Sequence, residues 1–161
     1  MAVLRTAAAV APPGVAVTIY DGLATLPHFN PDDDGDRLDP AVERLRASID
    51  EADALLFCTP EYAGALPGSF KNLLDWTVGG VEINDKSVGW INASTAPTGA
   101  VLSHDSLRHV LSYVGADIIE AACVRIGVPR ESVGVDGTIT DARIRSQVAA
   151  VVLALTGHAS K

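Results

Sequence analysis

The chain has 161 residues, a length that accommodates one domain of ordinary size and leaves little room for a second. Apolar types make up 48% and charged types 20%, so enough apolar side chain is present to offset the chain entropy of folding, which excludes wholesale disorder. Twelve Lys and Arg residues against twenty Asp and Glu give a net charge of −8, which argues against nucleic acid or an anionic membrane as the main partner.

Cysteine content and apolar runs bound the class of protein further. Cys58 and Cys123 lie inside apolar runs and cannot build a disulfide framework, so we expect two packed thiols. One of the longest apolar runs, Val148–Leu155, has eight residues, far fewer than the roughly eighteen that a membrane-spanning helix needs. The Ala-rich start lacks the basic and then apolar order of a secretion signal. These features predict a soluble cytoplasmic protein.

The first third of the chain alternates between helical and extended patterns. Helical spacing of apolar residues predicts helices over Ala2–Val10 and Pro40–Ala52, the second begun by an Asp-Pro pair. The β-branched run Val15–Tyr20 predicts a short strand, and Leu23–Leu38 has the composition of a long loop. Ala54–Cys58 is continuously apolar, which is typical of a strand covered on both faces and predicts a central parallel strand.

The remainder of the chain repeats this alternation. A helix begins at Pro67 and ends at the glycine pair 79–80, and apolar spacing places another before Gly115 and a last one over Ile144–Leu155. Strands are expected at Ser87–Ala93 and near Ile118–Ile126. Strands and helices that alternate at this spacing predict an open parallel α/β sheet with helices on both faces, in one domain over residues 1–161.

Three clusters of polar residues give no catalytic or metal site. The acidic run that contains Asp32 and Asp34 lacks the glycine and terminal Glu of a calcium loop, so we interpret it as a solvated loop. The four histidines show no metal-ligand spacing. Ser103, His104 and Asp105 are neighbours on a helix, where side chains point in different directions and cannot form a relay.

Ligands of an open parallel sheet bind at the carboxyl ends of its strands, and two loops there are the candidate site. One joins the apolar strand to the helix that begins at Pro67, and the other follows the strand Ser87–Ala93. The candidate binding residues are Pro60, Glu61, Tyr62, Ala63, Gly64, Ser94, Thr95, Ala96, Thr98 and Gly99. Both loops lead into helix starts, and their small residues let a flat ring approach backbone N–H groups. Ordinary strand-to-helix turns share this composition.

The first loop and its helix carry a motif that resembles the Pro-Glu-Tyr-Asn-x-x-x-Pro-Gly-x-x-Lys-Asn-x-x-Asp-Trp signature of the NAD(P)H-dependent FMN reductase family. This family includes quinone, chromate and azo-dye reductases. Nine residues match at the right spacing: Pro60, Glu61, Tyr62, Pro67, Gly68, Lys71, Asn72, Asp75 and Trp76. A weaker resemblance extends from residue 1 to about Val128. The resemblance implies a flavodoxin-like fold.

This chain departs from the family pattern at two places. Ala63 stands where the family usually carries Asn, so a side-chain amide contact near the flavin is absent. Family members begin with an apolar strand and a Gly-Ser-x-Arg-x-x-Ser phosphate loop, and Met1 falls after both. The resemblance therefore implies an N-terminally truncated domain that lacks the first strand of the family. We expect a sheet of four strands in which the Val15 strand is unpaired or leaves a gap beside the Ala54 strand. We also expect weak FMN binding, because the phosphate loop is missing.

The resemblance also implies the function. We expect an enzyme that passes hydride from NADPH or NADH to FMN and on to a quinone-like or other small electron acceptor, with no catalytic side chain because the flavin carries the chemistry. The alternatives are a flavodoxin-like electron carrier and a flavin-free chain. A homodimer or tetramer is implied, through the helix from Pro67 to Trp76, where the large aromatic suits an interface.

Overall fold

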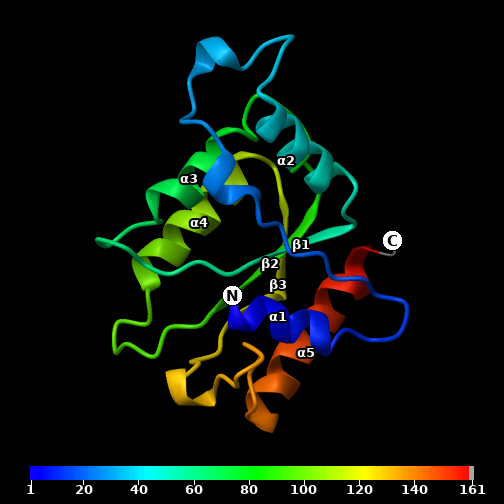
Figure 1. Ribbon diagram of the computed structural model, residues 1–161, viewed down its shortest axis with the longest axis vertical. Coiled ribbons are helices and arrows are strands. Elements are labelled where there is room, and N and C mark those ends of the chain that lie inside the picture. The colour runs from blue at the N-terminus through cyan, green and yellow to red at the C-terminus, as the bar shows by residue number, and fades with distance from the viewer. Residues whose placement is uncertain (160–161) are drawn as a thin grey trace.

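Three parallel strands form the sheet at the centre of the computed structural model, which describes residues 1–159 (Figure 1). They are β1 (Ala54–Phe57), β2 (Ser87–Asn92) and β3 (Asp117–Arg125), in the order β1-β2-β3. All six residues of β2 are buried, whereas all four of β1 are half-buried. The prediction that the Ala54 strand is central is therefore wrong: β2 is the central strand, and β1 lies at an edge.

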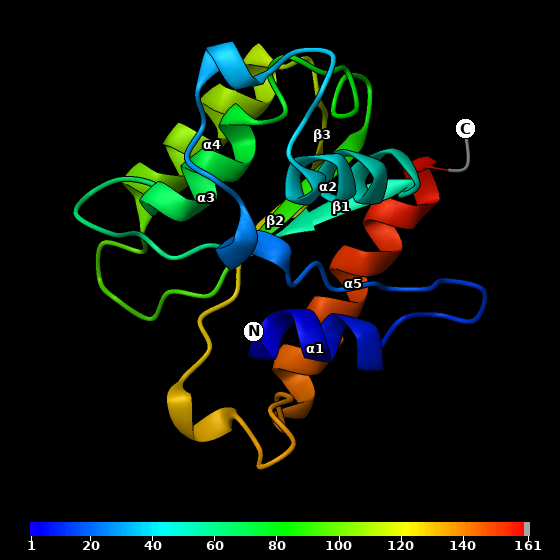
Figure 2. The ribbon, with the colours of Figure 1, turned by 45° about the horizontal axis from the view of Figure 1, so that its top comes forward.

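Two helices cover one face of the sheet. They are α1 (Ala2–Ala9) and α5 (Ala142–Ala159), which lie together on the same side in both ribbon views (Figures 1 and 2). Their apolar residues pack with Ile91 of β2 and with residues of β3 in one buried cluster. The Thr6 hydroxyl of α1 accepts a hydrogen bond from the backbone N–H of Ile139 at 2.8 Å, which ties the first helix to the segment that leads into the last.

Three helices cover the opposite face: α2 (Pro40–Asp50), α3 (Gly68–Asp75) and α4 (Val101–Tyr113). Figure 2 shows α3 and α4 on the other side of the sheet from α1 and α5. The buried residues of these helices form a second cluster with Val88 and Trp90 of β2. The prediction of helices on both faces is confirmed. None of the helices within residues 1–159 has the length and apolar content to cross a membrane.

The segment from Val15 to Tyr20 is not part of the sheet. The prediction of a four-stranded sheet is therefore wrong, whereas the prediction that the Val15 segment is unpaired is confirmed. Side chains in this segment alternate between half-buried and exposed over residues 15–19, as in a strand. Val15 packs against the cluster on the α1 face and Tyr20 against the cluster on the opposite face. Val15 and Tyr20 are an odd number of residues apart, so in an extended chain they point to opposite sides; the segment keeps this strand-like alternation but pairs with no strand of the described residues.

The loop over residues 22–38 is more ordered than its composition predicts. It contains two 3₁₀ turns, Gly22–Thr25 and Pro31–Asp33, and its centre is fixed by Trp76, whose indole N–H donates to the carbonyl of Pro27 at 2.8 Å. Trp76 is 1% exposed. The interpretation of Trp76 as an interface aromatic is therefore wrong, because the side chain is buried within its own chain. Asp34, expected in a solvated loop, instead forms an ion pair with Arg46 at 2.7 Å.

Both cysteine thiols are free and half-buried. Burial raises the pKa of Cys58, and burial raises that of Cys123 to about 11. Since only the thiolate is nucleophilic, both thiols are unreactive near neutral pH. We expect native protein at pH 8 to incorporate iodoacetamide at both positions much more slowly than urea-unfolded protein, as measured by mass spectrometry. Labelling of native Cys123 at the rate of the unfolded chain would contradict the burial argument.

Candidate functional site

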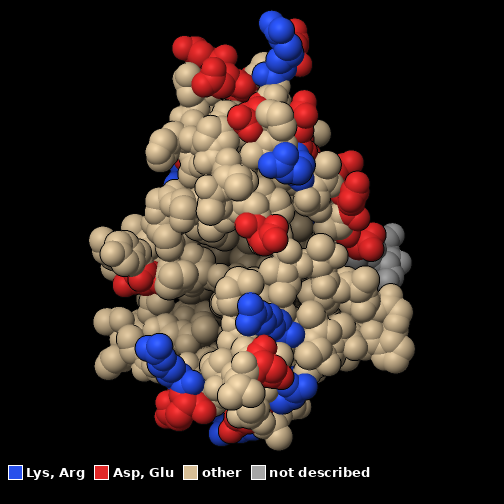
Figure 3. Space-filling model, in the orientation of Figure 1, with Lys and Arg blue, Asp and Glu red and all other residues tan. Residues whose placement is uncertain are grey.

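The carboxyl ends of β1 and β2 open onto a hollow in the surface. The loop after β1 (residues 58–67) and the loop after β2 (residues 93–100) project from the same edge of the sheet, and Figure 3 shows the surface hollowed between them, left of centre. Two other open hollows, of about 400 and 480 Å³, have Lys86 on their lining and lie at the opposite edge, where the strands begin. The larger is also lined by Asp53, Asp85 and Asp117, and this acidic lining is unsuited to phosphate-bearing ligands.

The loop after β1 is held in place by a carboxylate. Glu61 is half-buried, and its Oε2 accepts a hydrogen bond from the backbone N–H of Ser103 in the first turn of α4, at 3.2 Å. This contact places a negative charge at a helix N-terminus, where the helix dipole favours it. Tyr62 is 74% exposed and exchanges two backbone hydrogen bonds with Ala65, at 2.9 and 3.1 Å. The loop after β1 is therefore joined through Glu61 to the start of α4, and the Tyr62 ring stays accessible.

Ala63 and Gly64 form a two-residue turn in which both residues have positive φ, 52° and 72°. Such turns favour Asn followed by Gly, because an L-residue with a Cβ is strained in this region. We expect Ala63→Asn to raise the free energy of unfolding by about 0.5–1 kcal/mol, measured by urea denaturation. The matched control is Ala65→Asn, at the exposed end of the same turn, where no positive φ has to be relieved. An equal gain from both substitutions would contradict the strain argument.

The loop after β2 is shaped by two polar side chains. Asn92 ends the strand; its Nδ2 donates to the carbonyl of Gly99, and its Oδ1 accepts from the N–H of Ser94. The Arg125 guanidinium at the end of β3 donates to the carbonyls of Ser94 and Ala96, at 3.3 and 2.7 Å. Gly99 has a φ of 64°, and a Cβ there would collide with the guanidinium of Arg125. The loop is thus a braced structure whose backbone conformation favours glycine at this position.

Some of the predicted N–H donors are used within the loops and others are free. The N–H groups of Ala96 and Gly99 bond inside their own loop. Among the candidate binding residues, all of them in the described part of the chain, five backbone N–H groups have no partner: those of Glu61, Ala63, Gly64, Thr95 and Thr98. Free N–H groups on two facing loops fit the carbonyl-bearing edge of a flat ring. Pro60 is exposed beside Glu61 and, as a proline, contributes no N–H.

Buried polar side chains gather at this edge of the sheet. The described residues include seven buried polar or charged side chains, and four of them lie at the carboxyl edge: Thr59, Asn92, Ser103 and His104. Buried polar groups are costly in a core and concentrate where a ligand is bound. None of these four residues was among the candidate binding residues, and Ser103 and His104 were considered only as parts of a relay. Asn92 had one usable signal, since it is a polar residue that ends an otherwise apolar strand.

The Ser103-His104-Asp105 triplet does not form a relay. Ser103 Oγ and His104 Nδ1 are 3.3 Å apart, but each also bonds the carbonyl of Ala100, and Asp105 is exposed. Because a carbonyl only accepts, both groups are used as donors to Ala100, and neither activates the other. No group of three His, Cys, Asp or Glu side chains in residues 1–159 could hold a metal ion.

Comparison with known proteins identifies the family of the chain. The family model of the NADPH-dependent FMN reductases matches residues 1–128. An NAD(P)H-dependent FMN reductase of Pseudomonas aeruginosa is 30% identical over 149 residues, which cover 91% of this chain and 80% of that protein. An NAD(P)H:quinone oxidoreductase of Solanum tuberosum is 29% identical over 88% of this chain and 75% of its own length.

A solved structure extends the likeness to the fold. It is FerB, a flavoenzyme NAD(P)H:(acceptor) oxidoreductase of Paracoccus denitrificans, with a TM-score of 0.80 and 30% identity, covering 98% of this chain and 88% of that one. The flavodoxin-like fold expected from the motif is therefore confirmed. Taken with the family match over residues 1–128, the likeness shows that this chain belongs to the NADPH-dependent FMN reductase family.

Proposed function

We propose that this chain binds FMN in the hollow between the loops after β1 and β2 and passes hydride from NADPH or NADH through the flavin to a quinone-like or other small acceptor. Membership of the family supports the reaction class. The observation that carries the site is the gathering of four buried polar side chains and five free backbone N–H groups at one sheet edge.

The residues present fit the ring of the cofactor. Flavin, when bound, supplies the hydride chemistry, so the chain needs to position the ring, leave one face open and stabilise negative charge on the reduced form. The free N–H groups of Gly64 and Thr95 lie on opposite loops and suit ring carbonyls. The N-terminus of α4 already holds the Glu61 carboxylate, so the free N–H groups are the donors left for negative charge on the reduced ring. Catalysis then requires no side-chain acid or base.

We further propose association at least to a dimer in the cytoplasm. The apolar residues Leu73 and Leu74 of α3 are buried within the chain, so that helix has little apolar side chain left for a partner. Exposed apolar residues remain beside the hollow instead: Tyr62 at 74% and Leu102 at 60% exposure, with the Leu102 side chain close to Gly64. A patch of this kind suits an interface or an apolar acceptor. A monomer by light scattering at working concentration would overturn this proposal.

Two measurements on the purified chain test the function. FMN is titrated into the protein with flavin fluorescence as the readout, and NADPH oxidation is then followed with a quinone acceptor. Saturable FMN binding with steady NADPH oxidation supports the proposal. FMN binding without NADPH turnover would favour an electron carrier, whose partners the net charge of −8 would bias toward basic proteins. Absence of FMN binding would favour a flavin-free chain. The same titration gives the dissociation constant of FMN and so tests the prediction that binding is weak.

A further inference from the structure

One buried polar atom at the carboxyl edge has no partner. His104 is 8% exposed, and its Nε2 is buried without any hydrogen bond. The other ring nitrogen, Nδ1, is 2.8 Å from the carbonyl oxygen of Ala100. Because that oxygen can only accept, Nδ1 carries the hydrogen, and Nε2 of the neutral ring is left with a lone pair that seeks a donor. An unmet acceptor in a buried position costs free energy and calls for an explanation.

His104 lies where the two loops of the site meet. Its Nδ1 contact holds the ring against Ala100, the residue after Gly99 in the second loop. The preceding residue, Ser103, donates its backbone N–H to Glu61 of the first loop. Side chains in the first turn of a helix also lean toward its N-terminus, which here is the end that follows the loop after β2. His104 is therefore the buried imidazole closest in the fold to both predicted binding loops.

We propose that Nε2 of His104 accepts a hydrogen bond from the bound flavin, an inference that rests on the proposed function. The chemistry of the lone pair selects the ligand atom, since an acceptor requires an N–H or O–H. Oxidised flavin offers one such group on its ring, the imide N–H between two carbonyls. Because Nε2 is covered in this structure, the bond requires the groups that cover it to move. His104 is then a binding residue that orients the ring, in addition to the backbone N–H groups.

Two amide variants separate the roles of the two ring nitrogens. His104→Asn places an amide where Nδ1 lies, so it keeps the donor to Ala100 and removes the Nε2 acceptor. His104→Gln places an amide where Nε2 lies and keeps an acceptor oxygen there. We expect His104→Asn to weaken FMN binding about tenfold, whereas His104→Gln stays within about threefold of the wild type. His109→Asn, at an exposed position on the same helix, is the matched control and should bind FMN unchanged.

An FMN analogue methylated at the imide nitrogen identifies the ligand atom. Methylation should weaken binding to the wild type about tenfold and leave binding to His104→Asn nearly unchanged, because the bond is already lost there. Equal FMN affinity of His104→Asn and wild type, or an equal effect of methylation on both, would overturn the inference while the proposed function stands. Absence of FMN binding by the wild type would overturn both. Urea unfolding of each variant without FMN identifies any variant that fails to fold. In that case the inference is tested by whether methylation of the imide nitrogen weakens FMN binding to the wild type.

Discussion

Replacement of Trp76 with alanine should lower the free energy of unfolding by about 3–5 kcal/mol, one of the two largest effects that we expect from a single substitution. The side chain is 1% exposed at the end of α3. Its ring meets Phe29 edge to face with centroids 5.0 Å apart, and its N–H donates to the carbonyl of Pro27. Truncation would open a cavity and release the loop over residues 22–38. Urea denaturation followed by far-ultraviolet circular dichroism measures the loss.

The control for this prediction is Trp76→Phe. Phenylalanine keeps most of the apolar volume and loses the hydrogen bond to Pro27, so we expect a smaller loss of about 1–2 kcal/mol. If Trp76 served a subunit interface instead, both variants would change the oligomeric state by light scattering and leave the unfolding of the separated subunit almost unchanged. A loss below about 1 kcal/mol for Trp76→Ala would contradict the buried role.

The recognised motif combines residues with two different roles, which the sequence alone does not separate. Glu61 and Tyr62 lie at the carboxyl edge, in the candidate site. Asn72 and Trp76 both bond the carbonyl of Pro27, and Asn72 also accepts from the N–H of Phe29, so these two residues anchor the preceding loop. A motif match shows that residues recur together at fixed spacing. It does not show which of them face a ligand, because packing partners recur in the same way.

Helix positions followed from local pattern more reliably than sheet topology did. The helix predicted over Pro40–Ala52 lies at Pro40–Asp50, and its start follows from Asp39, whose Oδ1 accepts from the backbone N–H of Ala41 at 2.7 Å. Caps and apolar spacing are local signals. Whether Val15–Tyr20 joins the sheet depends on whether a strand lies beside it within hydrogen-bond distance, and no strand of the described residues pairs with it. That information is not local, so a strand-like pattern was insufficient.

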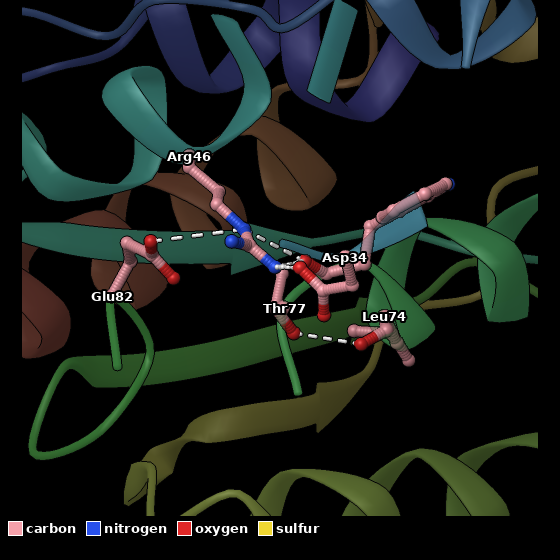
Figure 4. A network of polar contacts seen from close by, with 6 residues as sticks. Asp34, Arg46, Leu74, Thr77 and Glu82 are labelled. Carbon is pink, nitrogen blue, oxygen red and sulfur yellow. Dashed lines mark hydrogen bonds and ion pairs between the residues drawn. The ribbon is translucent and has the colours of Figure 1, made fainter. Parts of the chain in front are cut away.

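Arg46 joins parts of the chain that no local pattern connects. Figure 4 shows its guanidinium between Asp34 and Glu82, and it also donates through Nε and Nη2 to the carbonyl of Trp76, at 3.0 and 2.7 Å. The three charged side chains are only 10–18% exposed. Room for the carboxylates comes from the glycine pair 79–80, because a Cβ on Gly79 would collide with Asp34. The prediction that the helix from Pro67 ends at these glycines is wrong, since α3 ends at Asp75.

Arg46→Met should therefore lower the free energy of unfolding by about 3–5 kcal/mol, measured by urea denaturation. Methionine fills much of the volume of the arginine stem, so the loss comes from charge and hydrogen bonding. Two largely buried carboxylates would lose their cation, and the carbonyl of Trp76 would lose both of its donors. Removal of one partner from a buried ion pair is costly because the remaining charge stays desolvated.

The matched control is Arg44→Met, an exposed arginine on the same helix, for which we expect a change within about 0.5 kcal/mol. A triple variant that adds Asp34→Asn and Glu82→Gln to Arg46→Met should regain part of the lost stability, since it leaves no unpaired charge in the network. If the triple variant is less stable than Arg46→Met alone, the loss arises from packing around the guanidinium and the electrostatic explanation fails. If Arg46→Met and Arg44→Met lower the free energy of unfolding equally, the contacts of Arg46 with Asp34, Glu82 and Trp76 do not stabilise the fold.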